Sequence, residues 1–122
     1  MTLIDTSAWI EQLRRGGDAA VRRQVEALLG AGEAAWCPLV RLELWNGARG
    51  GEERTVLKEM EHTLPSLIID GAVWDLAATL ASRAREGGIS VPATDLLVAS
   101  CARHHEVPLL HRDGHFESVA RL

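Results

Sequence analysis

Apolar residues along the chain follow two alternating patterns, short runs and longer segments with helical spacing. The short runs predict four strands, at residues 2–4, 34–37, 67–69 and 107–110. The longer segments predict helices over residues 7–15, 18–30, 38–50, 52–64, 73–86 and 92–105, and a short helix after residue 113. Ser7 and Asp18 are the expected caps of the first two helices, and glycines and prolines separate most of the segments.

Strands that alternate with helices predict parallel pairing with right-handed crossovers. We therefore expect an α/β fold, a three-layer sandwich in which helices flank a mostly parallel central sheet. Residues 1–122 are expected to form a single domain, because the chain is too short for two packed cores. Functional sites in such folds lie at the carboxyl ends of the strands. Asp5 directly follows the first predicted strand, Asp113 lies just beyond the last, and the helix from Pro92 brings Asp95 to the same rim.

Composition and charge narrow the class of protein. No stretch approaches the roughly 20 apolar residues that span a bilayer, and the N-terminus lacks the pattern of a leader peptide, so we expect a cytoplasmic protein without a membrane segment. Cys37 and Cys101 lack C-x-x-C spacing, which indicates buried apolar side chains rather than a disulfide or a zinc site. The formal net charge of −4 argues against nucleic-acid binding by overall positive charge, so any such contact should be local.

Four carboxylates are candidates for chemistry, and each also has a structural interpretation. Asp5 can cap the helix that follows it, and Glu43 can be an exposed acid paired with Arg49 or another cation. Asp95 occupies a first helical turn, where the helix dipole favours a carboxylate in any case. Asp113 can simply be a turn residue before a glycine.

Taken together, the four acids indicate a metal site. Two carboxylates about 4 Å apart repel by roughly 4 kcal/mol at an effective dielectric near 20, so four in one place require a counter-charge or proton uptake. A divalent cation supplies that charge. An all-oxygen set without a nearby histidine or cysteine pair favours Mg²⁺ or Mn²⁺ over zinc, and such ions suit phosphodiester hydrolysis.

The order of four sequence blocks carries a resemblance to a known family. The blocks are LIDTSAWI at 3–10, RLELWNG at 41–47, ATDLLVASCA at 93–102 and PLLHRDGHF at 108–116. Their order and spacing over the whole chain resemble the PIN domain, and within that superfamily the VapC toxins of toxin–antitoxin pairs.

The resemblance implies a metal-dependent endoribonuclease. It implies that Asp5 and Asp95 chiefly hold Mg²⁺ or Mn²⁺, that Glu43 and Asp113 complete the acidic pocket, and that Ser7 supports the first aspartate. It also implies a homodimer, silenced by a VapB-like antitoxin whose C-terminal segment covers the groove.

Two positions near Asp113 depart from the family pattern. His111 stands where the family usually has Thr or Ser, and His115 stands where it often has a further aspartate. A neutral histidine can bind an outer-sphere water or a phosphate. We assign His111 a supporting role and take His115 with Arg41 and Arg112 as candidates for substrate binding, while tolerated rim substitutions are the favoured interpretation of both histidines.

Other function classes fit less well. A receiver domain needs paired aspartates near the first strand and a lysine after the last, whereas Asp5 has no acidic neighbour there and the only lysine, Lys58, lies mid-chain. A haloacid-dehalogenase-type phosphatase lacks its second aspartate in DTSAW. The stronger alternative is a catalytically weakened PIN-like module that binds RNA or a protein partner without cleaving.

Overall fold

A short parallel sheet lies at the centre of the molecule. The computed structural model describes residues 1–122, with three strands: β1 (Thr2–Ile4), β2 (Ala34–Ala35) and β3 (Leu109–Leu110). β1 is the middle strand in the order β2-β1-β3, and both pairings are parallel, with Leu3 opposite Ala35 on one side and Leu109 on the other. The backbone N–H of Asp5 extends this ladder by donating to the Leu110 carbonyl at 2.9 Å, which places Asp5 at the carboxyl edge of the sheet.

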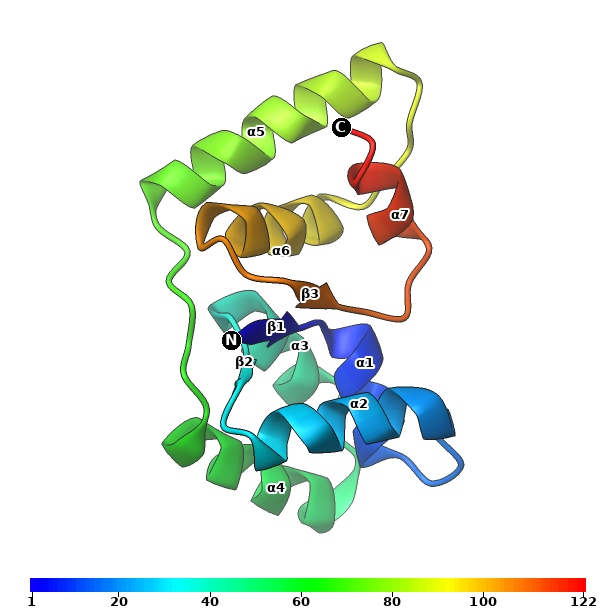
Figure 1. The fold of residues 1–122 in the computed structure, drawn as a ribbon, viewed down its shortest axis with the longest axis vertical. Coiled ribbons are helices and arrows are strands. Elements are labelled where there is room, and N and C mark those ends of the chain that lie inside the picture. Colours follow the sequence, from blue (N-terminus) through cyan, green and yellow to red (C-terminus); the bar gives the residue numbers. More distant parts are fainter.

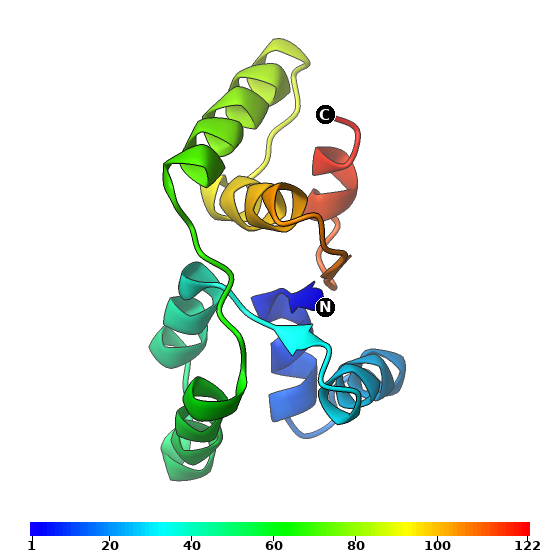
Figure 2. The ribbon, with the colours of Figure 1, turned by 60° about the vertical axis from the view of Figure 1, so that its left-hand side comes forward.

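Seven helices surround the sheet in two groups. They are α1 (Thr6–Leu13), α2 (Ala19–Gly30), α3 (Pro38–Asn46), α4 (Gly50–Thr63), α5 (Gly71–Glu86), α6 (Ala93–His104) and α7 (His115–Val119). In Figures 1 and 2, α5, α6 and α7 lie on one side of the strands, and α1, α2 and α4 lie on the other. The predicted three-layer α/β sandwich is therefore confirmed.

The predicted strand at residues 67–69 is wrong. This segment makes only an isolated parallel bridge between Trp36 and Ser66, with Leu67 N–H donating to the Trp36 carbonyl at 2.8 Å. The chain around Trp36 has little room to pair, because Pro38 already begins α3 two residues later. An apolar run long enough for a strand therefore lacks a partner strand to pair with.

The strand predicted at residues 107–110 is shortened for a related reason. Val107 N–H donates to the Ala102 carbonyl at 3.0 Å, so this residue closes the end of α6 instead of joining the sheet. Glu106, just before it, has φ of 55°, the left-handed backbone that commonly follows a helix. Only Leu109 and Leu110 remain free to pair with β1.

Of the two predicted helix caps, one is confirmed and the other is wrong by two residues. Asp18 caps α2, accepting from Val21 N–H at 2.9 Å, as predicted. The cap of α1 is Asp5 rather than Ser7, because the Asp5 carboxylate accepts the Ser7 backbone N–H at 2.9 Å. Asp70 caps α5 through Val73 N–H in the same way, a role that the sequence analysis did not assign.

Buried apolar residues from both helical groups meet across β1. Leu3 and Ile4 are fully buried, and α6 buries every residue from 96 to 102. A helix buried on all sides is held in place by packing rather than by its own polar face. Cys37 and Cys101 are free and buried in this core, which confirms their interpretation as apolar side chains. None of the helices combines the length and the apolar character needed to cross a membrane.

Candidate active site

Asp5 is a buried carboxylate whose orientation is set by Ser7. Its Oδ2 accepts hydrogen bonds from both the backbone N–H and the hydroxyl of Ser7, at 2.9 and 2.6 Å. Asp5 is only 4 % exposed. Ser7 Oγ in turn accepts the backbone N–H of Arg112 at 2.9 Å, which ties α1 to the loop after β3. Oδ1 of Asp5 receives no hydrogen bond from the chain and stays available for another partner. The capping interpretation and the site interpretation of Asp5 therefore use different oxygens.

Glu43 reaches the same region from the middle of α3. Its Oε1 accepts the Thr6 hydroxyl at 2.8 Å. Burial raises the pKa of Glu43, the Thr6 hydrogen bond lowers it in part, and the charge of Asp5 raises it again. The alternative that Glu43 pairs with Arg49 is wrong, because the Arg49 backbone N–H donates to Glu53 and no cation pairs with Glu43.

Asp95 lies in the first turn of α6 with its side chain 15 % exposed. Burial raises the pKa of Asp95 to about 6, and the charge of Asp113 is the next cause in size. The charges of Asp5 and Glu43 act in the same direction, while His115 opposes them. The pKa of Asp95 thus responds to all three of the other candidate acids, so the fold brings the four into one electrostatic neighbourhood.

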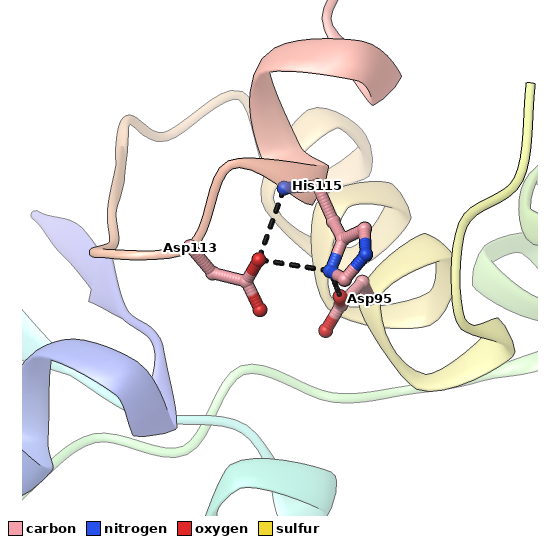
Figure 3. A group of neighbouring side chains, drawn as sticks. All are labelled: Asp95, Asp113 and His115. Atoms are coloured by element: carbon pink, nitrogen blue, oxygen red, sulfur yellow. Dashed lines mark hydrogen bonds and ion pairs between the residues drawn. The ribbon is translucent and has the colours of Figure 1, made fainter.

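Asp113 and His115 lie beside Asp95, where the chain enters α7. Asp113 Oδ1 accepts the His115 backbone N–H at 3.0 Å, which makes Asp113 a turn residue as well as a site candidate. The His115 ring folds back over it, with Nδ1 at 2.9 Å from Asp113 Oδ1 and 3.4 Å from Asp95 Oδ2 (Figure 3). His115 is therefore part of the acidic cluster. Its ring contacts two of the four acids while its side chain stays 48% exposed, so His115 lies at the rim of the cluster and touches it.

His111 lies behind Asp113 rather than in the cluster. Its Nδ1 faces the Asp113 backbone N–H at 3.3 Å, and its ring packs against Phe116 with centroids 4.9 Å apart. This contact supports the turn that carries Asp113, in line with the supporting role assigned to His111.

The two arginine candidates for substrate binding are already paired. Arg41 donates from Nε to Glu61 at 2.9 Å, and Arg112 Nη1 lies between Glu11 and Asp18, at 2.8 and 3.1 Å. Either arginine would have to exchange these carboxylates for a phosphate. The sequence showed both arginines but not the carboxylates that neutralise them, because those partners lie up to 101 positions away along the chain.

Thr6 is a residue of the site that the sequence analysis missed. It stands directly between Asp5 and Ser7, and its hydroxyl holds Glu43. The available signal was a pair of adjacent hydroxyl residues immediately after the first aspartate, which allows one hydroxyl to serve each of two carboxylates.

The donor set of this cluster fits a divalent cation. No arginine or lysine pairs with Asp5, Glu43, Asp95 or Asp113, and His115 is the one side chain that can bring positive charge to them. One ligand atom from each of Asp95, Asp113 and His115 lies within 4.8 Å of the others. Burial is the main cause of the raised pKa of Asp95, and the charges of Asp113, Asp5 and Glu43 add to it; a bound cation would offset that repulsion.

Comparison with known proteins extends over the whole chain. The family model described as the PIN domain matches residues 2–122. Ribonuclease VapC11 of Mycobacterium tuberculosis is 36% identical over 126 aligned residues, which cover 100% of this chain and 93% of that protein. Ribonuclease VapC21 of the same species is 28% identical over 108 residues, covering 84% of this chain and 77% of that protein.

Solved structures show the same fold. VapBC2 from Rickettsia felis, bound to a DNA fragment from its promoter, matches with a TM-score of 0.79 and 17% identity, covering 99% of this chain and 94% of that one. FitAcB from Neisseria gonorrhoeae matches with a TM-score of 0.74 and 21% identity, covering 100% and 94%. Identities this low support the fold and no finer comparison.

Proposed function

We propose, from the premise that the chain belongs to the PIN domain family and within it to the VapC ribonucleases, that it is a metal-dependent endoribonuclease acting as the toxin of a toxin–antitoxin pair. The observation that carries the proposal is that ligand atoms of Asp95, Asp113 and His115 lie within 4.8 Å of one another, with the charges of Asp5 and Glu43 near enough to raise the pKa of Asp95 and no arginine or lysine paired with any of the four acids. Such a pocket is costly for a protein that uses it only for structure.

The cofactor we propose is Mg²⁺ or Mn²⁺, held chiefly by Asp5 and Asp95, with Asp113 completing the set. A divalent cation, when bound, supplies a Lewis acid for the charge that develops on a phosphoryl oxygen and lowers the pKa of bound water. Ser7 orients Asp5 so that Oδ1 is free for coordination. Glu43 has a raised pKa and one oxygen, Oε2, outside its hydrogen bond with Thr6, so it is suited to accept a proton there.

We extend the proposal to partners and setting. Solved relatives with this fold include the VapBC complex of Rickettsia felis, so we propose a VapB-like antitoxin for this chain as well. A homodimer, a cytoplasmic location and a single domain over residues 1–122 complete the proposal. Arg41 and Arg112 would contact RNA only by releasing their present carboxylate partners.

RNA cleavage by the purified chain tests this function. We expect cleavage with Mg²⁺ or Mn²⁺, loss of cleavage in excess EDTA, and a loss of at least about 100-fold in Asp5→Asn, because that change removes a charged group from the metal pocket. The matched control is Asp75→Asn, which removes an exposed carboxylate on α5 and should cleave like the unmodified chain.

The alternative makes a different prediction. A catalytically weakened module would retain RNA in a gel-shift assay while leaving it intact with every metal tested. The same cleavage pattern in EDTA, or in Asp5→Asn, would contradict a metal-dependent mechanism outright.

A further inference from the structure

One imidazole nitrogen lies between two of the carboxylates of the pocket. His115 Nδ1 is 2.9 Å from Asp113 Oδ1 and 3.4 Å from Asp95 Oδ2, and the three side chains come from α6, the turn after β3 and the first residue of α7 (Figure 3). Asp113 also holds the His115 backbone N–H at 3.0 Å, which fixes the point from which the ring extends. The ring is therefore directed into the acidic cluster by local structure.

These separations suit a shared ion. Around an octahedral cation with ligands at about 2.1 Å, adjacent ligand atoms lie about 3.0 Å apart and opposite ones about 4.2 Å. The structure has two separations of 2.9 and 3.4 Å and keeps all three ligand atoms within 4.8 Å of one another. Two of the separations are therefore close to those of adjacent ligands, and the third is bounded at 4.8 Å, somewhat above the value for opposite ligands.

The chemistry of the three ligands differs from that of an all-carboxylate pocket. Mg²⁺ strongly prefers oxygen and gives up its water reluctantly, whereas imidazole nitrogen is a good ligand for first-row transition ions. Mn²⁺ accepts carboxylate oxygen as readily as Mg²⁺ does, and it also accepts nitrogen. We propose that His115 Nδ1 is a metal ligand together with Asp95 and Asp113, so that this pocket prefers Mn²⁺ to Mg²⁺. The inference rests on the proposed metal site and names its ion.

A second role for the ring would produce the same contacts. As an imidazolium, His115 would be a counter-charge that stands where the ion binds and must leave when the ion arrives. The two roles predict opposite effects of removing the ring. If His115 is a ligand, removing its ring weakens Mn²⁺ binding. If the ring is a competing cation, removing it strengthens the binding of both ions.

Direct metal binding by the full chain distinguishes these roles. Free Mn²⁺ is followed by its electron paramagnetic resonance signal during titration, and Mg²⁺ is measured by competition against Mn²⁺. In His115→Ala we expect Mn²⁺ affinity to fall at least about tenfold, with a change of less than about threefold for Mg²⁺. In His115→Asp, which restores an oxygen donor, we expect tighter Mg²⁺ binding and a smaller preference for Mn²⁺. His62→Ala, an exposed histidine on α4, is the matched control and should bind both ions like the unmodified chain.

A spectroscopic readout tests the nitrogen directly. Electron spin echo modulation of the Mn²⁺ complex should show coupling to a ¹⁴N nucleus that disappears in His115→Ala and persists in His62→Ala. Absence of that coupling, or Mn²⁺ affinity in His115→Ala equal to or above that of the unmodified chain, would overturn the proposal.

The ligand assignment and the ribonuclease function fail in different ways. If nitrogen coupling is seen but no metal form cleaves RNA, the proposed ribonuclease function is wrong and His115 is still a metal ligand. Cleavage with Mg²⁺ and Mn²⁺ alike, without nitrogen coupling, would support the ribonuclease and overturn the role of His115.

Discussion

Replacing Asp95 with asparagine should stabilise the metal-free protein while removing a ligand of the proposed site. Burial and the neighbouring carboxylates raise the pKa of Asp95 from 3.8 to about 6. A carboxyl whose pKa is higher in the folded state than in the unfolded state binds a proton more tightly when folded. Its contribution therefore makes the folded state less stable above about pH 6, and this cost disappears as the pH falls toward 4.

The size of the effect follows from the two pKa values. The difference between 3.8 and about 6 corresponds to about 3 kcal/mol of unfolding free energy, at about 1.4 kcal/mol for each pH unit. Solvent reaches the side chain, which is 15 % exposed, so screening reduces this figure. Asparagine also loses the favourable interaction of a charge with the start of α6, about 0.3 to 1 kcal/mol. We expect a net gain of about 1 to 2 kcal/mol at pH 8 and about a third of that at pH 4.5.

The assay compares urea unfolding of the unmodified chain and Asp95→Asn, in EDTA, across this pH range. The difference between the two proteins removes the effect of carboxyls such as Glu53 and Glu61, whose lowered pKa is common to both, and reports on Asp95 together with its repulsion by Asp113, Asp5 and Glu43. Asp75→Asn serves as the control and should show no pH-dependent difference. Adding Mn²⁺ at about 100 times its dissociation constant should reverse the order, by stabilising the unmodified chain by about 2.7 kcal/mol. An Asp95→Asn protein that is less stable at pH 8 and at pH 4.5 by the same amount would refute the reasoning.

Three further substitutions test the supports of the site and of the core. Ser7→Ala removes the hydroxyl that Asp5 accepts at 2.6 Å, so unfolding free energy should fall by about 1 kcal/mol and Mn²⁺ affinity about tenfold or more, measured by urea unfolding and metal titration. Thr6→Val removes the hydrogen bond that lowers the pKa of Glu43, so the acidic limb of the pH–rate profile should move to higher pH; an unmoved limb would exclude Glu43 as the proton acceptor. Leu80→Ala removes a fully buried side chain of α5 and should cost about 2 to 5 kcal/mol of unfolding free energy; a loss below about 1 kcal/mol would contradict the packing.

The sequence was sufficient to place Asp5 and Asp113 at one edge of the sheet. That inference needed the first and last strands to be parallel neighbours, and β1 and β3 do pair in this way although they have only three and two residues. The helices followed from hydrophobic spacing and from caps such as Asp18, which are local features. Local features are those that a single sequence records most directly.

What the sequence did not predict depends on partners distant along the chain. Thr6 meets Glu43 across 37 positions, and Arg112 meets Glu11 across 101. No local pattern marks either pair. The run at residues 67–69 failed as a strand for the same reason, since strand formation requires a free neighbouring edge, and the chain beside it turns into α3 after Trp36. The histidines near Asp113 were visible in the sequence, but the direction of the His115 ring was not.

The four acids differ in how well the surrounding structure supports them. Asp5 follows a fully buried pair of residues in β1, and Asp95 stands on α6, whose residues 96–102 are all buried. Asp113 lies between a two-residue strand and a five-residue helix, the least supported position of the set. The corner that contains Asp113 and His115 can therefore adjust around an ion while Asp5 and Asp95 stay in place. In the metal site that we propose, the well-packed Asp5 and Asp95 would fix the position of the ion, and the less supported Asp113 and His115 would adjust to it.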